Sequence, residues 1–189
     1  ADSTESFRLR INELLSVDLK KEHYRIEGDY WGYYERVWRT HGLEGKVLMD
    51  DLNKEMMIDQ SHVPLLPNAL YTTSELTNRY KIVLMTSRDR LWKKATLKWL
   101  RSHLGDSFLD VHFTGNKHNS ESKTKGQLWR EVGASWLIDD NPDHCQSAID
   151  EGIEAILFGD YGWHVNVRKG TTRCKDWLAV LEYFDGKSG

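Results

Sequence analysis

The chain has 189 residues, of which 39% are hydrophobic, 29% charged and 11% aromatic. This length suits one domain, or one domain with a small insertion, and the apolar content argues against a wholly disordered chain. The formal net charge of −3, from 26 basic and 29 acidic residues, disfavours a uniformly basic nucleic-acid binder. No apolar run approaches the ~20 residues that cross a bilayer, and we expect neither a membrane anchor nor a signal peptide.

The first sixty residues show helical spacing of apolar side chains and no convincing strand. This spacing predicts three helices, over residues 4–15, 29–40 and 47–58. Ser3 or Thr4 is the expected N-cap of the first helix. Gly42 is expected to end the second, which is rich in aromatic residues.

From residue 66 onward, predicted strands and helices alternate, after a boundary marked by Pro64 and Pro67. The predicted strands, the first of them buried, cover residues 82–85, 108–113, 136–138 and 153–158. The predicted helices cover 68–79, 90–103 and 123–132, one that starts at Pro142, and 175–184. This alternation is typical of an α/β domain with a parallel sheet and right-handed crossovers.

Polar residues follow each predicted strand, and in open α/β sheets ligands bind beyond the carboxyl ends of the strands. In strand order, these residues are Thr86–Arg88, Thr114–Asn116, Asp139–Asn141 and Gly159–Tyr161. They supply hydroxyls, carboxylates and amides, and we expect them to converge at one edge of the sheet.

Asp139 and Asp140 are the most specific chemical signal among these residues. Two adjacent carboxylates at the end of a strand repel each other unless a cation or a hydrogen-bond donor is present. A hard cation such as Mg²⁺ suits these oxygen ligands. The alternative is that one carboxylate caps the helix that starts at Pro142 and the other is solvated.

Two other groups of residues could bind a phosphate. Thr86 and Ser87 offer hydroxyls and backbone N–H groups to an anion, or else form an ordinary strand-to-helix cap. Lys123 and Lys125 lie at or before the start of the predicted helix 123–132, which leads into the Asp139 strand. They could carry positive charge to the sheet edge, or else be solvated.

The segments KIVLMTSR, SKTKGQLW and WLIDDNPDH resemble, in order and strand context, motifs two, three and four of the haloacid dehalogenase (HAD) superfamily of phosphohydrolases. Within it, they are most similar to the 5′(3′)-deoxyribonucleotidase group, the cytosolic type C nucleotidases. The resemblance covers nearly the whole chain. It implies a Rossmann-like α/β core over residues 66–189 and a helical cap over residues 1–65.

The resemblance also implies a Mg²⁺-dependent phosphomonoesterase. In such enzymes an aspartate attacks the phosphate and forms an aspartyl-phosphate, and a second aspartate acts as general acid and base. Carried onto this sequence, Thr86 would hold a phosphate oxygen with Ser87 beside it. Lys125, with Lys123 as the fallback, would neutralise the charge of the phosphate and the nucleophile. Asp139 and Asp140 would complete the Mg²⁺ site.

The sequence departs from this pattern at its start. Ala1 and Asp2 would be the last two residues of the motif Asp-x-Asp-Gly-Val-Leu-Ala-Asp, so both catalytic aspartates would precede Ala1. The strand that carries the motif would be the central one, between strands 82–85 and 136–138. A parallel sheet without it leaves backbone groups unpaired. We therefore expect the natural protein to have roughly ten or more further N-terminal residues.

The expected substrate-binding residues are Met56, Met57, Arg88 and Lys123. Met56 and Met57, with Ile58, lie where the resemblance would put an apolar pocket for a base. Tyr30, Trp31 and Trp38 either extend that pocket or form the cap's own core. Surface or structural roles are favoured for His144, Trp163 and His164, because no metal-ligand spacing of histidines appears.

The resulting hypothesis is a phosphatase that acts on nucleoside monophosphates or similar small phosphate esters. One alternative substrate class is a nucleic-acid end or a sugar phosphate, and another reading is a catalytically inactive HAD-like protein with a binding or regulatory role. The expected partners are a small phosphorylated substrate, with no membrane and no duplex nucleic acid; a homodimer is left open. Two cysteines, Cys145 and Cys174, are too few for a secreted disulfide scaffold and favour inert thiols in the cytoplasm.

Overall fold

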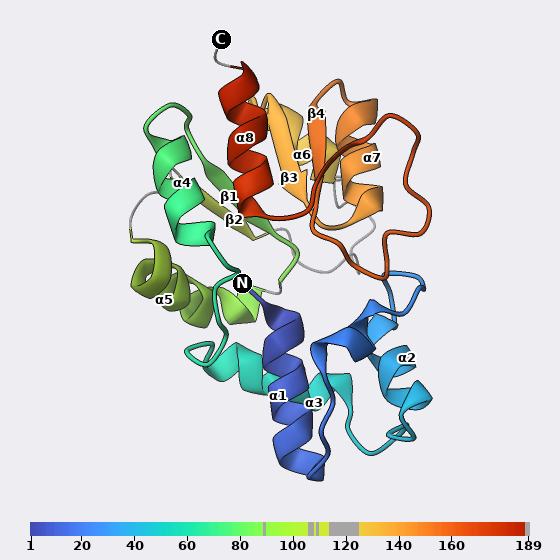
Figure 1. Ribbon diagram of the computed structural model, residues 1–189. Coiled ribbons are helices and arrows are strands. Elements are labelled where there is room, and N and C mark those ends of the chain that lie inside the picture. Colours follow the sequence, from blue (N-terminus) through green and yellow to red (C-terminus); the bar gives the residue numbers. More distant parts are fainter. Residues whose placement is uncertain (89, 106–107, 109, 114–124, 188–189) are drawn as a thin grey trace. The chain divides into compact units, whose positions relative to one another are not determined.

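The computed structural model describes residues 1–88, 90–105, 108, 110–113 and 125–187 (Figure 1). The chain divides into two compact units. Unit 1 comprises residues 1–24 and 34–116, and unit 2 comprises residues 25–33 and 117–189. Segment 25–33, from the part of the sequence predicted to form a cap, therefore folds with the C-terminal residues. The division into a cap and a core after residue 65 stays a prediction.

Unit 1 contains most of the helices and one small sheet. In chain order its elements are α1 (Ser3–Leu15), the 3₁₀-helix η1 (Lys21–Arg25), α2 (Tyr33–Thr40), α3 (Met49–Ile58), α4 (Ala69–Thr77), β1 (Val83–Thr86), the 3₁₀-helix η2 (Arg90–Trp92), α5 (Lys93–Leu104) and β2 (Asp110–Phe113). The prediction that the first sixty residues contain no strand is confirmed. The predicted helix over 90–103 is divided, since its first turn is the 3₁₀-helix η2.

Helix α1 starts one residue earlier than predicted, because its N-cap is Asp2 rather than Ser3 or Thr4. The Asp2 carboxylate accepts a hydrogen bond from the Glu5 backbone N–H at 3.0 Å. An ionised carboxylate at this position satisfies an otherwise unpaired N–H and faces the positive end of the helix. Phe7 and Ile11 form the apolar part of its buried face.

The aromatic-rich helix is shorter than predicted and begins at Tyr33 instead of residue 29. Gly32 has a φ of 68°, outside the helical region, so the helix cannot extend through it. The preceding residues are held in unit 2 by other bonds. The Gly28 N–H donates to the Gly162 carbonyl at 3.0 Å, and the Tyr33 hydroxyl donates to the Ile26 carbonyl at 3.1 Å.

Unit 2 is built on a three-stranded parallel sheet in the order β3–β4–β5. Its elements are α6 (Lys125–Glu131), β3 (Trp136–Asp139), α7 (Pro142–Asp150), β4 (Glu154–Phe158), β5 (Thr172–Cys174) and α8 (Trp177–Lys187). The central strand β4 carries the core, and its Ile156 and Leu157 are fully buried. Strand β5 was not predicted, because it is only three residues long and one of its residues is exposed.

The α/β fold with parallel strands is confirmed, but the described strands form two sheets rather than one. Strand β1 pairs in parallel with β2, and β3 belongs to the other sheet. The prediction that β1 is a buried strand is wrong, since all four of its residues are half-buried. A two-stranded sheet gives each strand a single neighbour, and this leaves less of its surface covered.

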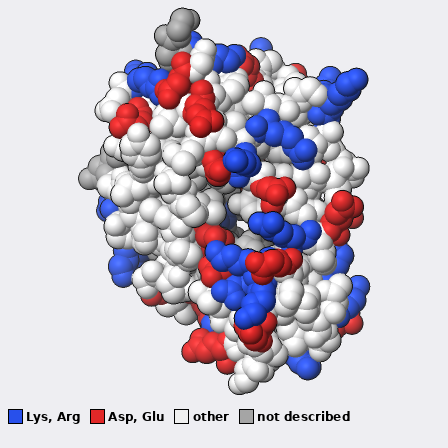
Figure 2. Space-filling model, in the orientation of Figure 1, with Lys and Arg blue, Asp and Glu red and all other residues white. Residues whose placement is uncertain are grey.

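None of the helices in the described part of the chain is long and apolar enough to cross a membrane. Basic and acidic side chains are intermingled on the face of the molecule drawn in Figure 2.

Candidate functional site

Asp139 and Asp140 stand where β3 ends and the turn into α7 begins. The N-cap of α7 is Asn141, whose side chain accepts a hydrogen bond from the Asp143 N–H at 2.8 Å and is 1% exposed. Pro142 is the first helical residue, as predicted. The alternative reading, in which a carboxylate of the pair caps this helix, is therefore wrong, because the amide of Asn141 already does so.

The Asp139 carboxylate is held by two donors. Its Oδ1 accepts from the Asn141 backbone N–H at 2.9 Å and lies 3.0 Å from Nδ1 of His144. An ionised carboxylate only accepts, so this contact requires the proton of His144 on Nδ1. The Asp139 side chain is 12% exposed and that of His144 21%. The orientation of Asp139 is therefore set locally, by residues of the following helix.

Asp140 is held through its backbone. Its carbonyl accepts from Nε1 of Trp163 at 2.9 Å and from Nε2 of His164 at 2.9 Å. Both donors come from the loop after β4, so this loop fixes the turn that carries the two carboxylates. Burial lowers the pKa of His164, because the charged imidazolium is poorly solvated there.

An aromatic cluster supports the Trp163 ring. Trp163 stacks on Tyr161 with ring centroids 4.3 Å apart, and Tyr33 meets it edge-on at 4.9 Å. Gly162 has no room for a side chain, because a Cβ there would overlap the Ile26 carbonyl oxygen. The structural role predicted for Trp163 therefore includes a direct contact with the carboxylate turn.

Thr86 ends β1 in unit 1 and starts a short polar loop with Ser87 and Arg88. The Thr86 hydroxyl accepts from the backbone N–H of Arg88 at 3.2 Å. This bond closes a hydroxyl turn of the kind that places small polar residues at the end of a strand. Three of the predicted phosphate- and substrate-binding residues of unit 1, Thr86, Ser87 and Arg88, thus lie on one loop.

The Arg88 side chain leaves this loop and joins it to the end of α3. Its Nη1 donates to Oε1 of Gln60 at 2.7 Å and to Oγ1 of Thr96 at 3.3 Å. Gln60 Nε2 in turn donates to the Met56 carbonyl at 3.0 Å. The Met56 side chain is only 2% exposed and belongs to the core, whereas Met57 beside it is half-buried. Of the two predicted pocket methionines, Met57 is therefore the more accessible.

The lysines predicted to neutralise the phosphate are only partly covered. Lys123 and the loop Thr114–Asn116 lie outside the described residues. Lys125 is the first residue of α6, and its backbone is described. Helix α6 packs closely on α7, where the Gly126 N–H donates to the Ser147 hydroxyl at 3.2 Å. In the part of the chain that the structure describes, no group of three or more His, Cys, Asp or Glu side chains is arranged to hold a metal ion.

Two residues that organise these loops, Gln60 and Thr96, were missed in the sequence, and Asn141 was named as a polar residue after a strand but not as the cap of α7. Each is polar and at most 4% exposed. Gln60 and Thr96 belong to no motif, and their burial is a tertiary property. Asn141 has a local signal, since it directly precedes a proline at the start of a helix. The two cysteines are buried and unpaired, as expected for inert thiols, and burial raises the pKa of Cys174.

No protein-family model matches the sequence, and no curated protein matches it. Solved structures with the same fold do match. One is a HAD-superfamily hydrolase from Ehrlichia chaffeensis, at 12% identity and a TM-score of 0.53, over 98% of this chain and 88% of the other. Another is a haloacid dehalogenase-like hydrolase from Streptococcus pneumoniae, at 15% identity and a TM-score of 0.53, over 97% and 92%. The chain therefore has the fold of HAD-superfamily hydrolases, as its motifs predicted.

Proposed function

We propose that this protein is a HAD-type hydrolase, a Mg²⁺-dependent phosphomonoesterase acting on nucleoside monophosphates or similar small phosphate esters. The observation that carries the proposal is the Asp139–Asp140 pair at the carboxyl end of β3, held on one side by His144 and on the other by Trp163 and His164. The fold shared with HAD hydrolases supports the reaction class. The nucleotide substrate rests on the motif resemblance.

The donor set of this turn fits Mg²⁺. Two carboxylates supply hard oxygen ligands, and Mg²⁺ commonly binds one or two protein carboxylates and completes its shell with waters and phosphate oxygens. When bound, Mg²⁺ would neutralise phosphate charge, the main requirement of phosphoryl transfer.

The motif resemblance also assigns the residues that would bind the phosphate. Thr86 and Ser87 would offer hydroxyls and N–H groups to its oxygens, and Lys125 would add a positive charge. Phosphoryl transfer depends on such positioning and charge stabilisation more than on any unusual side-chain chemistry.

A binding protein without turnover is the second candidate. The Asp2 carboxylate caps α1, so it serves the helix rather than a phosphate. Such a protein would bind a phosphate ester and Mg²⁺ and release no phosphate.

One assay tests both candidates. Phosphate release from a panel of nucleoside monophosphates and sugar phosphates is measured with Mg²⁺ and with EDTA, on the natural protein with whatever residues precede Ala1 in it, and on its Asp140→Asn variant. Release that needs Mg²⁺ and falls about 100-fold or more in Asp140→Asn is the expected result, since removing one key charge in such a site commonly costs this much. Ligand-induced stabilisation without phosphate release would support the binding protein instead.

A further inference from the structure

Arg88 carries a positive charge that no described carboxylate neutralises. Among the described residues, its Nη1 donates only to the neutral oxygens of Gln60 and Thr96, which are 2% and 4% exposed. Burial lowers the pKa of Arg88, yet a guanidinium stays protonated near neutral pH. Removing part of the water from such a charge is costly unless an anion replaces it.

Hydrogen bonding fixes which way the Gln60 side-chain amide is turned. Its Nε2 donates to the Met56 carbonyl at 3.0 Å, and this oxygen can only accept. Nε2 also lies 3.0 Å from Oγ1 of Thr96. The amide oxygen must therefore face Arg88, so Gln60 and Thr96 hold the guanidinium through Nη1. Neither Nε nor Nη2 of Arg88 has a hydrogen-bond partner among the described residues, and neither atom is fully buried. The guanidinium lies over the ring of Trp92, 5.8 Å from its centroid, and this contact supplies no counter-charge.

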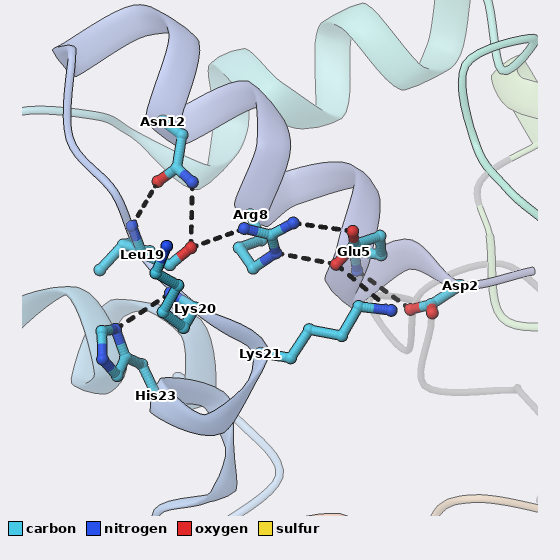
Figure 3. Close-up of polar contacts among 8 residues, drawn as sticks. All are labelled: Asp2, Glu5, Arg8, Asn12, Leu19, Lys20, Lys21 and His23. Carbon is cyan, nitrogen blue, oxygen red and sulfur yellow. Dashed lines mark hydrogen bonds and ion pairs between the residues drawn. The ribbon is translucent and has the colours of Figure 1, made fainter.

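Arg8, in the same unit, has the hydrogen bonds expected of an arginine with a structural role (Figure 3). Its Nε and Nη2 both donate to the Glu5 carboxylate at 2.8 Å, and its Nη1 donates to the Leu19 carbonyl at 2.6 Å. The guanidinium in turn lowers the pKa of Glu5, by hydrogen bonding and by charge. All three nitrogens of Arg8 are used and its charge is matched, which is the arrangement that Arg88 lacks.

We propose that Arg88 binds the phosphate group of a small phosphate ester, and that Gln60 and Thr96 are positioning residues that aim its guanidinium. Arg88 follows Thr86 and Ser87 on the same loop, and its Nε and Nη2 form the fork that binds two oxygens of a phosphate. The choice of phosphate rests on the proposed function; the anion site itself rests on the contacts of Arg88. Gln60 lies two residues after the end of α3. The same bonds therefore connect the C-terminal end of that helix, where Met57 lies, to the loop of Thr86, Ser87 and Arg88.

The test is binding of inorganic phosphate to the full 189-residue chain, measured by isothermal titration calorimetry. Arg88→Met is expected to weaken phosphate binding at least tenfold, as for the loss of a charge-assisted pair of hydrogen bonds. Arg88→Lys keeps the charge without the fork and should fall between this variant and the wild type. Arg8→Met is the matched control, and it should lower stability while leaving phosphate affinity unchanged.

Two further variants separate positioning from a merely structural role. Gln60→Glu supplies a carboxylate that pairs with Arg88 and competes with the ligand, so phosphate should bind more weakly although the arginine is intact. Thr96→Val should also weaken binding, and Thr96→Ser, which keeps the hydroxyl, should restore it. Near-ultraviolet circular dichroism confirms that each variant is folded.

Unchanged phosphate affinity in a folded Arg88→Met variant would overturn this inference, and so would a wild-type chain that binds no phosphate. Phosphate binding that depends on Arg88, in a protein that hydrolyses no ester in the assay above, would support the anion site and reject the proposed enzyme. The two proposals therefore fail in distinguishable ways.

Discussion

Asp139 and Asp140 look equivalent in the sequence, but different atoms of each are held. Asp139 is fixed through its carboxylate, by His144 and the Asn141 N–H. Asp140 is fixed through its carbonyl, by Trp163 and His164. Two donors on one carbonyl limit the backbone rotation that would turn the pair away from the edge of the sheet.

A substitution of Trp163 tests this arrangement. Trp163→Phe keeps an aromatic ring in the cluster and removes the N–H that binds the Asp140 carbonyl. Loss of one buried hydrogen bond is expected to lower the free energy of unfolding by about 1 kcal/mol. It should also weaken Mg²⁺ binding, measured by calorimetry, because the turn is less constrained.

The matched control is Trp31→Phe, whose side chain is 71% exposed. An exposed substitution of this kind should change the free energy of unfolding by about 0.5 kcal/mol or less. Urea denaturation of the three proteins gives the comparison. Equal stabilities for Trp163→Phe and the wild type would show that the hydrogen bond contributes nothing.

Among the elements, helices α6 and α7 pack closely against each other. A Cβ at Gly126 would overlap the Ser147 carbonyl oxygen, which belongs to the backbone and cannot rotate away. The missing side chain at Gly126 therefore sets the distance between these helices. Because Lys125 directly precedes Gly126, the same contact holds the start of α6.

Two glycine substitutions in helices test this packing. Gly126→Ala should separate α6 from α7 and lower the free energy of unfolding by about 1–3 kcal/mol, the usual cost of overpacking. Gly186→Ala in α8 meets no atom within 4 Å. It should leave stability unchanged or raise it by up to about 1 kcal/mol through helix propensity. Chemical denaturation of both variants is the measurement, and a stabilising Gly126→Ala would contradict the packing.

For the molecule as a whole, the net charge disfavours duplex DNA as a partner. The net charge is −3, and basic and acidic side chains are intermingled on the face drawn in Figure 2. Duplex DNA is bound through rows of Lys and Arg that release counterions from many phosphates.

The net charge of −3 predicts no measurable binding to duplex DNA. The fluorescence anisotropy of a labelled duplex should stay constant as protein is added at physiological salt. A salt-dependent rise in anisotropy, stronger at low salt, would show a basic surface and reject the prediction.

Most elements could be predicted from local pattern, since each depends on neighbours a few residues away. The run before Thr86 and the run before Asp139 were recognised as strands, and Pro142 marked the start of a helix. Errors arose where a distant segment decides the outcome. The helix predicted from residue 29 begins at Tyr33, because residues 25–33 are bonded to the loop around Gly162.

The fold class and the residues available for chemistry follow from the amino-acid sequence. Strand and helix periods are local, and the polar residues that end parallel strands can be read in order along the chain. The groups that orient these residues are brought to them by the packing of distant segments. Gln60 reaches Arg88 across 28 positions, and Trp163 reaches Asp140 across 23. Such pairs leave no periodic signal, because a hydrogen bond between distant segments depends on where the packed elements bring their atoms.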